Sequence, residues 1–242
     1  MSEDKNNQSI TDVLFAEICE LSSHSMADAV GRAAHIAAVD LYNVLDKSED
    51  WVRADFSMAI NLLEANVEWL GAQVSSGILN CLNTNHEGKL VPQVPKPQTT
   101  IQSAQLDSLS LVSKDEFEDW LVANMGVKFL ETELSSELLS VEQILCSLSG
   151  KGENSKNCSI SPESIFKVLK ESIDSLEIPQ APQTTFYKTL SRSLLPDLKG
   201  LYDAIAREAQ RAGLNYKEAS LDLSSQITGR KVPANVERHQ QQ

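Results

Sequence analysis

The sequence predicts an all-α protein, in which a long N-terminal helical hairpin is followed by an antiparallel helical bundle with little or no sheet. Apolar residues recur every three or four positions over most of the 242-residue chain, as they do on one face of a helix. Helix start and stop signals flank several of these stretches. No stretch combines alternating apolar and polar residues with hairpin signals, so we expect little or no sheet.

The first expected element is a long helix. Residues 1–9 are polar and should form a disordered tail. From Ile10 to Leu45 apolar residues follow the helical period, but the stripe changes phase around Ser22–Ser25, which predicts a break or bend there. The stretch Ala27–Ala38 is rich in small residues, so a neighbouring helix can approach it closely.

A second long helix should complete the hairpin, which we expect to span residues 10–83. Ser48 offers a capping hydroxyl, and an apolar stripe continues from Val52 to Ile78. Because the connection at residues 46–48 is short, the two helices should lie antiparallel.

Two segments have the composition of linkers. Residues 84–105 contain Pro92, Pro95 and Pro97, which predicts an extended, proline-rich linker and a domain boundary. Residues 214–242 contain few large apolar residues and should form a flexible tail. The helical bundle is therefore placed at residues 106–213.

The bundle should begin with one continuous helix. Ser113-Lys114-Asp115-Glu116 has the capping-box pattern, in which the Ser and Glu side chains each accept a hydrogen bond from an otherwise free backbone N–H. The apolar stripe that follows includes Leu121 and reaches Leu148, and Gly126 is the place where the helix can bend.

Two further helices are expected after a glycine-rich stop. Ser161-Pro162-Glu163 combines a capping hydroxyl, a first-turn proline and an acid, so a helix should run from there to about Leu176. A last helix should end at Gly213, and Pro196 should kink it or divide it in two, because proline lacks the N–H that the helix needs.

Charge and composition restrict the possible partners and location. The formal net charge of −13 repels phosphate backbones, so we expect no nucleic-acid partner and no binding to anionic membranes. The chain has neither an export signal nor a run of 18 apolar residues, which favours a cytoplasmic location without membrane insertion. The four cysteines are widely spread and form no C-x-x-C pair, so we expect reduced thiols and no metal site.

No catalytic set is recognisable. The chain has no Glu-x-x-His pair, nucleophile elbow, zinc-protease motif or Walker loop, and we expect no cofactor. The large aromatic residues are interpreted as core anchors, and any that is exposed would indicate a partner surface. These aromatic residues are Trp51, Trp69, Trp120, Phe186, Tyr187 and Tyr202.

Parts of the chain resemble a known family. The run Leu109-Ser110-Leu111-Val112 leading to Phe117-Glu118-Asp119-Trp120-Leu121 is similar to a segment of the DUF1631 family, large proteins of unknown function found mainly in proteobacteria. Tyr187-Lys188-Thr189-Leu190 resembles the family's Leu-Tyr-Lys-Leu-Phe stretch. The resemblance covers roughly residues 105–215, with weaker similarity from Met26 to Leu63.

The chain also departs from that family's pattern. Cys158 and Ser159 replace an Asn-Pro pair that usually precedes a helix, and family members continue for several hundred residues, so the chain resembles a short or truncated relative. The resemblance implies a helical fold and a bacterial cytosolic origin. It provides no catalytic residues to carry over.

These observations favour a non-enzymatic cytosolic adaptor or regulatory scaffold that binds a protein partner and forms a homodimer. The alternative is a signalling module that binds a small ligand or nucleotide second messenger between helices, which would require Arg192, Arg207 and Arg211 to converge on one cavity. An enzyme, third in order, would need a buried carboxylate or histidine in a cleft. The candidate contact residues are Arg192, Arg207, Arg211, Trp120, Tyr187 and Tyr202.

Overall fold

The computed structural model describes residues 2–86, 114–149 and 159–214, with side chains from Ile10 and Leu121 onward in the first two of these segments. Within them the chain forms seven α-helices and no strand, which confirms the all-α prediction. The helices are α1 (Ser2–Leu45), α2 (Asp50–Ala65), α3 (Val67–His86), α4 (Lys114–Glu133), α5 (Ser135–Ser149), α6 (Pro162–Ser175) and α7 (Gln180–Arg211).

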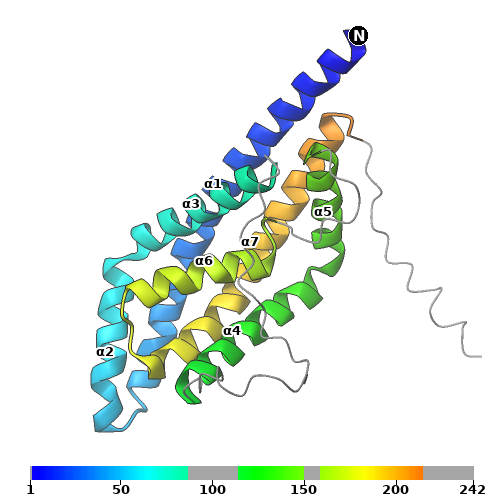
Figure 1. Ribbon diagram of the computed structural model, residues 1–242. Helices are drawn as coiled ribbons and strands as arrows, with labels where there is room; N and C mark the ends of the chain where they lie inside the picture. The colour runs from blue at the N-terminus through cyan, green and yellow to red at the C-terminus, as the bar shows by residue number, and fades with distance from the viewer. Residues whose placement is uncertain (1, 87–113, 150–158, 215–242) are drawn as a thin grey trace, which may run out of the picture.

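Helix α7 lies at the centre of the arrangement. It packs along α1 on one side and along α4 and α5 on the other, while α3 contacts both α1 and α6 (Figure 1). The buried apolar side chains of the N-terminal and C-terminal helices form one cluster. The hairpin and the bundle that the sequence distinguishes therefore share a single core.

Two polar contacts show the relative direction of α1 and α7. Arg32 donates a hydrogen bond of 2.8 Å to Asp197, and Thr189 donates one of 2.7 Å to Asp40. A step of eight residues forward on α1 thus matches a step of eight residues back on α7. The two helices are antiparallel over this length.

Helix α1 differs from the sequence expectation at two places. It begins at Ser2, although a disordered tail is expected over residues 1–9, and it continues without a break through Ser22–Ser25. Ser22 is fully buried there, and the hydroxyls of Ser23 and Ser75 lie 2.6 Å apart. Both α3 and α7 pack on this one continuous helix, so its buried residues meet more than one neighbour.

The second hairpin helix is divided in two. Helix α2 ends at Ala65 and α3 begins at Val67, with the Asn66 side chain donating to the carbonyl oxygen of Leu62. Ser48 does not cap α2, because its hydroxyl donates to the carbonyl oxygen of Val44 at the end of α1 instead. Helix α3 packs tightly on the small-residue stretch of α1, where a Cβ placed on Gly71 would lie 2.8 Å from the carbonyl oxygen of Ala27.

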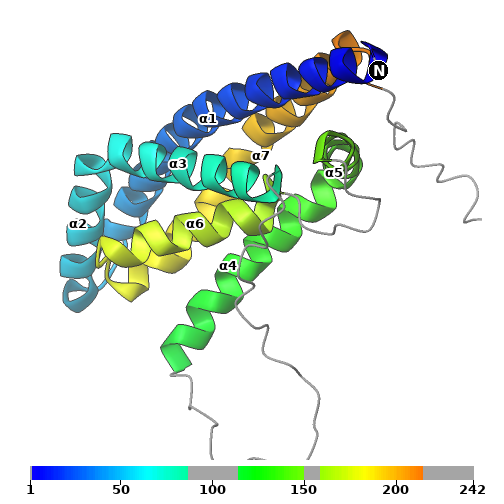
Figure 2. The same cartoon turned by 45° about the horizontal axis from the view of Figure 1, so that its top comes forward.

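The expected continuous helix of the bundle is also divided. It breaks at Leu134 rather than at Gly126, so that α4 and α5 run in different directions (Figure 2). Leu134 is fully buried, and both α4 and α5 contact α7. The break allows both helices to stay packed on α7.

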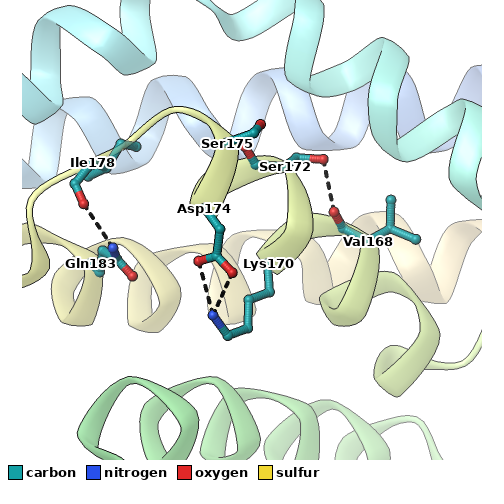
Figure 3. Close-up of polar contacts among 7 residues, drawn as sticks. All are labelled: Val168, Lys170, Ser172, Asp174, Ser175, Ile178 and Gln183. Atoms are coloured by element: carbon teal, nitrogen blue, oxygen red, sulfur yellow. Dashed lines mark hydrogen bonds and ion pairs between the residues drawn. The ribbon is translucent and has the colours of Figure 1, made fainter. Parts of the chain in front are cut away.

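Helix α6 begins as the capping signals predict. The Ser161 hydroxyl accepts a hydrogen bond of 3.2 Å from the backbone N–H of Ser164, and Pro162 occupies the first turn. The connection to α7 is short, and the Gln183 side chain donates to the carbonyl oxygen of Ile178 across it (Figure 3).

Helix α7 begins at Gln180 and passes through Pro196 without a break, so of the two expected outcomes, a kink or a division, the division is wrong. Pro196 and Arg192, the residue whose carbonyl loses its partner, are both exposed, so water can bind the free carbonyl group. Gly213 follows the end of the helix with a φ of 72°, a left-handed conformation that favours glycine.

Three remaining expectations concern the proline-rich linker, the C-terminal tail and membrane insertion. Helix α3 reaches His86, and the rest of the expected linker over residues 84–105 lies outside the described residues, as does the tail from residue 215. None of the helices described is long and apolar enough to cross a bilayer.

Candidate functional site

The two candidate tyrosines lie in the core. Tyr187 and Tyr202 are each about 1% exposed, and the Tyr202 hydroxyl donates to the carbonyl oxygen of Ile160. The Tyr187 ring makes an edge contact with Phe186, their centroids 5.5 Å apart, and a tilted contact with Phe166. Both tyrosines therefore anchor α7 in the core. The side chain of Trp120 lies outside the described side chains.

The three candidate arginines are all exposed, but they are not brought together. Arg192 and Arg207 are fifteen residues apart on the uninterrupted helix α7, about 22 Å by helical rise. Arg211 is paired with Glu208 at 2.6 Å. A single phosphate group cannot bridge Arg192 and Arg207 at that separation.

The titratable groups of the described part include two half-buried thiols and one partly buried carboxyl group. No group of three or more His, Cys, Asp or Glu residues there could hold a metal ion. Burial raises the pKa of Cys19 and of Cys81, so neither thiol is activated as a thiolate. Partial burial, and then the charge of Glu131, raises the pKa of Glu142.

An apolar surface is exposed on α4. Leu121, Met125 and Phe129 are 42%, 64% and 38% exposed, and their spacing of four residues places them on one side of the helix. We call these three residues the α4 stripe. The opposite side of α4 is fixed in the core by Ala123, Val127 and Leu130. The α4 stripe is therefore an ordered apolar ridge that the described core does not cover.

Helix α7 runs beside α4 and supplies cations to the same region. A Cβ placed on Gly126 would lie 3.1 Å from the Cβ of Ser191, so glycine permits close contact between the two helices here. Because Met125 and Arg192 are the adjacent residues, they lie at the same level of the two helices. Lys188, one turn before Arg192, is also exposed.

A second apolar stripe is exposed on α1. It consists of Ile36, Val39 and Tyr42, which are each a little under half exposed, and we call it the α1 stripe. Trp51 follows at the start of α2 and is 77% exposed, with its indole N–H donating to Glu49. Trp69 is also partly exposed, so the prediction that these two tryptophans are core anchors is wrong.

The sequence interpretation missed the α4 stripe. The apolar period predicts that Leu121 is buried, which is wrong, and it does not predict that Met125 and Phe129 are exposed. A signal was present in the repeat of large apolar residues at intervals of four, beside a second apolar series that includes Val127 and Leu130. Two parallel series on one helix indicate an apolar face wider than one contact requires.

Comparison with known proteins identifies one match. Residues 11–213 match the family model described as "Protein of unknown function (DUF1631) N-terminal domain". The match includes the N-terminal helices as well as the region from residue 105 where the sequence resemblance is strongest. No curated protein and no solved structure matches the chain.

Proposed function

Because the chain belongs to the DUF1631 family, whose function is unknown, we propose a function from its exposed surface. The chain is a non-enzymatic protein-interaction module, an adaptor or regulatory scaffold, and it binds its partner through the α4 stripe. The observation that carries this proposal is the exposure of three large apolar side chains in a row on a helix whose other side is buried. Exposed apolar surface of this kind is typical of protein–protein contact sites.

The composition of the α4 stripe supports a protein partner. Methionine and aromatic residues are enriched at protein interfaces, and Met125 and Phe129 provide one of each. A ridge anchored by Gly126 against α6 and α7 loses little conformational freedom when a partner binds, which favours affinity. The separation of Arg192 from Arg207 gives the small-ligand alternative no comparable support.

The proposal includes a location and an oligomeric state. We place the protein in the bacterial cytoplasm, where the thiols of Cys19 and Cys81 would remain reduced. We also expect the chain to form a homodimer, with the α1 stripe as the surface that is free for self-association when the α4 stripe is occupied.

The test is affinity purification of the tagged chain from its native cells, followed by mass spectrometry. The wild type is compared with the variant Leu121→Ser/Met125→Ser/Phe129→Ser and with the matched variant Ile36→Ser/Val39→Ser/Tyr42→Ser, which removes the same number of exposed apolar side chains. We expect one stoichiometric protein with the wild type and the α1-stripe variant, and its loss with the α4-stripe variant. Equal recovery with both variants, or no partner at all, would contradict the proposal. Circular dichroism confirms that each variant remains helical.

A further inference from the structure

We propose that the partner presents an acidic amphipathic helix, which lays its apolar face on the α4 stripe and its carboxylates on Lys188 and Arg192 of α7. This inference rests on the proposed function and specifies the chemistry of the partner. We call the combined area, the α4 stripe with Lys188 and Arg192, the α4–α7 surface.

The two halves of this surface are held together by the packing of α4 on α7. Gly126 lies against Ser191, and further along the chain Glu137 pairs with Lys199, so α4 and α7 run in the same direction. At about 100° per residue, Met125 and Arg192 therefore lie on the same side of this helix contact. Helices α4 and α7 run alongside each other in this region in Figure 1, and they are in contact. A single bound element can therefore reach both the apolar ridge and the cations.

The charge of this surface differs from that of the whole chain. The net charge is −13, and α4 carries acids at residues 115–119 and at Glu131 and Glu133, yet between these acids and along residues 180–200 of α7 the exposed charged residues are all cations. Two of these cations are already paired, Lys128 with Glu131 and Lys199 with Glu137. Lys188 and Arg192 make no ion pair with the described residues and are available to a partner.

The spacing of these residues favours a helix as the bound element. Leu121, Met125 and Phe129 extend over about 12 Å along α4, and residues at intervals of three and four on a partner helix would meet such a ridge. Lys188 and Arg192 are four residues apart, so they lie on one side of α7 and repel each other slightly. Glutamates along one edge of the partner helix would relieve that repulsion.

The same features argue against a nucleic acid on this surface. A phosphate backbone carries no apolar face to cover the α4 stripe, and the charge of −13 repels it at long range. An acidic protein helix satisfies both the apolar and the cationic part of the surface.

The test uses two designed helical peptides of about 20 residues with leucines along one face, which is long enough to cover the ridge. The first peptide carries glutamates beside the leucines, and the second carries lysines at the same positions. Binding is measured by fluorescence anisotropy against the whole chain and the variant Lys188→Glu/Arg192→Glu. The control variant Arg207→Glu/Arg211→Glu makes the same change of charge at the same spacing on the same helix.

We expect the acidic peptide to bind the wild type and the control variant, and to bind the Lys188→Glu/Arg192→Glu variant at least about tenfold more weakly. The lysine peptide should show the opposite preference, binding that variant better than the wild type. Affinity of the acidic peptide should fall as salt is added, since exposed charges are screened. Equal affinity for all three proteins, or no binding up to millimolar peptide, would overturn the inference.

The failure of this inference can be told apart from the failure of the proposed function. If the α4 stripe is needed for recovery of the cellular partner and the Lys188→Glu/Arg192→Glu variant recovers it unchanged, the partner binds the stripe without acidic contacts. If recovery does not depend on the α4 stripe, the proposed function itself is wrong.

Discussion

The hydroxyl of Tyr202 donates a hydrogen bond of 2.7 Å to the carbonyl oxygen of Ile160, and both residues are buried. Ile160 lies two residues before α6, and Tyr202 lies in the C-terminal half of α7. This bond satisfies a buried carbonyl group and connects the start of α6 to the central helix.

Replacing Tyr202 with phenylalanine should lower the free energy of unfolding by about 1–2 kcal/mol, because the carbonyl of Ile160 would remain buried without this donor. Urea unfolding followed by circular dichroism measures this change. Tyr42→Phe is the control, since Tyr42 is 45% exposed, and it should change stability by no more than about 0.5 kcal/mol. Equal stability of Tyr202→Phe and wild type would show that this bond contributes nothing.

Replacing Gly71 with alanine should destabilise the protein, because the added Cβ would lie 2.8 Å from the backbone carbonyl oxygen of Ala27. Backbone atoms cannot rotate away as a flexible side chain can, so α1 and α3 must move apart. We expect a loss of roughly 1–3 kcal/mol, as for other overpacked helix contacts, measured as a lower urea midpoint.

Gly200→Ala is the matched control for that substitution and should have the opposite sign. Gly200 lies inside α7, and a Cβ placed on it would meet no atom within 4 Å. Alanine should therefore stabilise the helix by roughly 0.5–1 kcal/mol. If both substitutions destabilise the protein equally, the close approach of α3 to α1 is not the cause.

Two glutamates should affect the pH dependence of stability in opposite directions. Burial and the charge of Glu131 raise the pKa of Glu142, so its contribution is favourable below the unfolded pKa of about 4.3 and is lost as pH rises through the folded pKa. Glu142→Gln should therefore stabilise the protein at pH 7. The gain should be below about 1 kcal/mol, because the group is still partly exposed to water, and it should disappear in acid.

Glu137, on the same helix as Glu142, should affect the pH dependence of stability in the opposite direction. A hydrogen bond from Ser136, with a further contribution from Lys199, lowers the pKa of Glu137. Its contribution is present above the unfolded pKa and is lost as pH falls through the folded pKa. Glu137→Gln should destabilise the protein at pH 7 and have no effect in strong acid. Thermal unfolding of both variants from pH 3 to pH 8 tests the pair, and parallel curves would contradict it.

The features predicted correctly from sequence are those set by a few neighbouring residues. The start of α6 at Ser161 and its end near Leu176 follow from local capping and proline signals, and the end of α7 follows from Gly213. Each requires only a hydroxyl, a ring or a missing Cβ at one position. Such signals do not depend on the rest of the fold.

The breaks between helices could not be predicted in the same way. The buried apolar series of α4 and α5 continues across Leu134 in sequence, whereas in the structure a turn there lets both helices pack on α7. The serines at 22–25 predict a break or bend, but the helix continues through them, and Ser23 contacts Ser75 of α3 there. These outcomes depend on which helix lies opposite.

The candidate site was predicted only in part. The sequence predicts Arg192 as a contact residue together with Arg207 and Arg211, whereas in the structure it lies one turn from Lys188 and at the level of Met125. Helical spacing alone cannot tell which of two apolar series on α4 is covered, because both have the same period. The answer depends on the positions of α6 and α7.

The α1 stripe should mediate a homodimer. Ile36, Val39 and Tyr42 are evenly spaced, so a two-fold axis at Val39 would place Ile36 of one copy against Tyr42 of the other. Light scattering coupled to size-exclusion chromatography should give the mass of a dimer for the wild type. The variant Ile36→Ser/Val39→Ser/Tyr42→Ser should give the mass of a monomer.

Salt dependence provides a further check on this dimer. Two copies that each carry a charge of −13 repel each other, and added salt screens that repulsion, so the dimer should become more stable as ionic strength rises. The variant Leu121→Ser/Met125→Ser/Phe129→Ser is the control and should remain dimeric. A monomer at micromolar concentration for the wild type would refute self-association, and loss of the dimer only in the control variant would assign it to the α4 stripe instead.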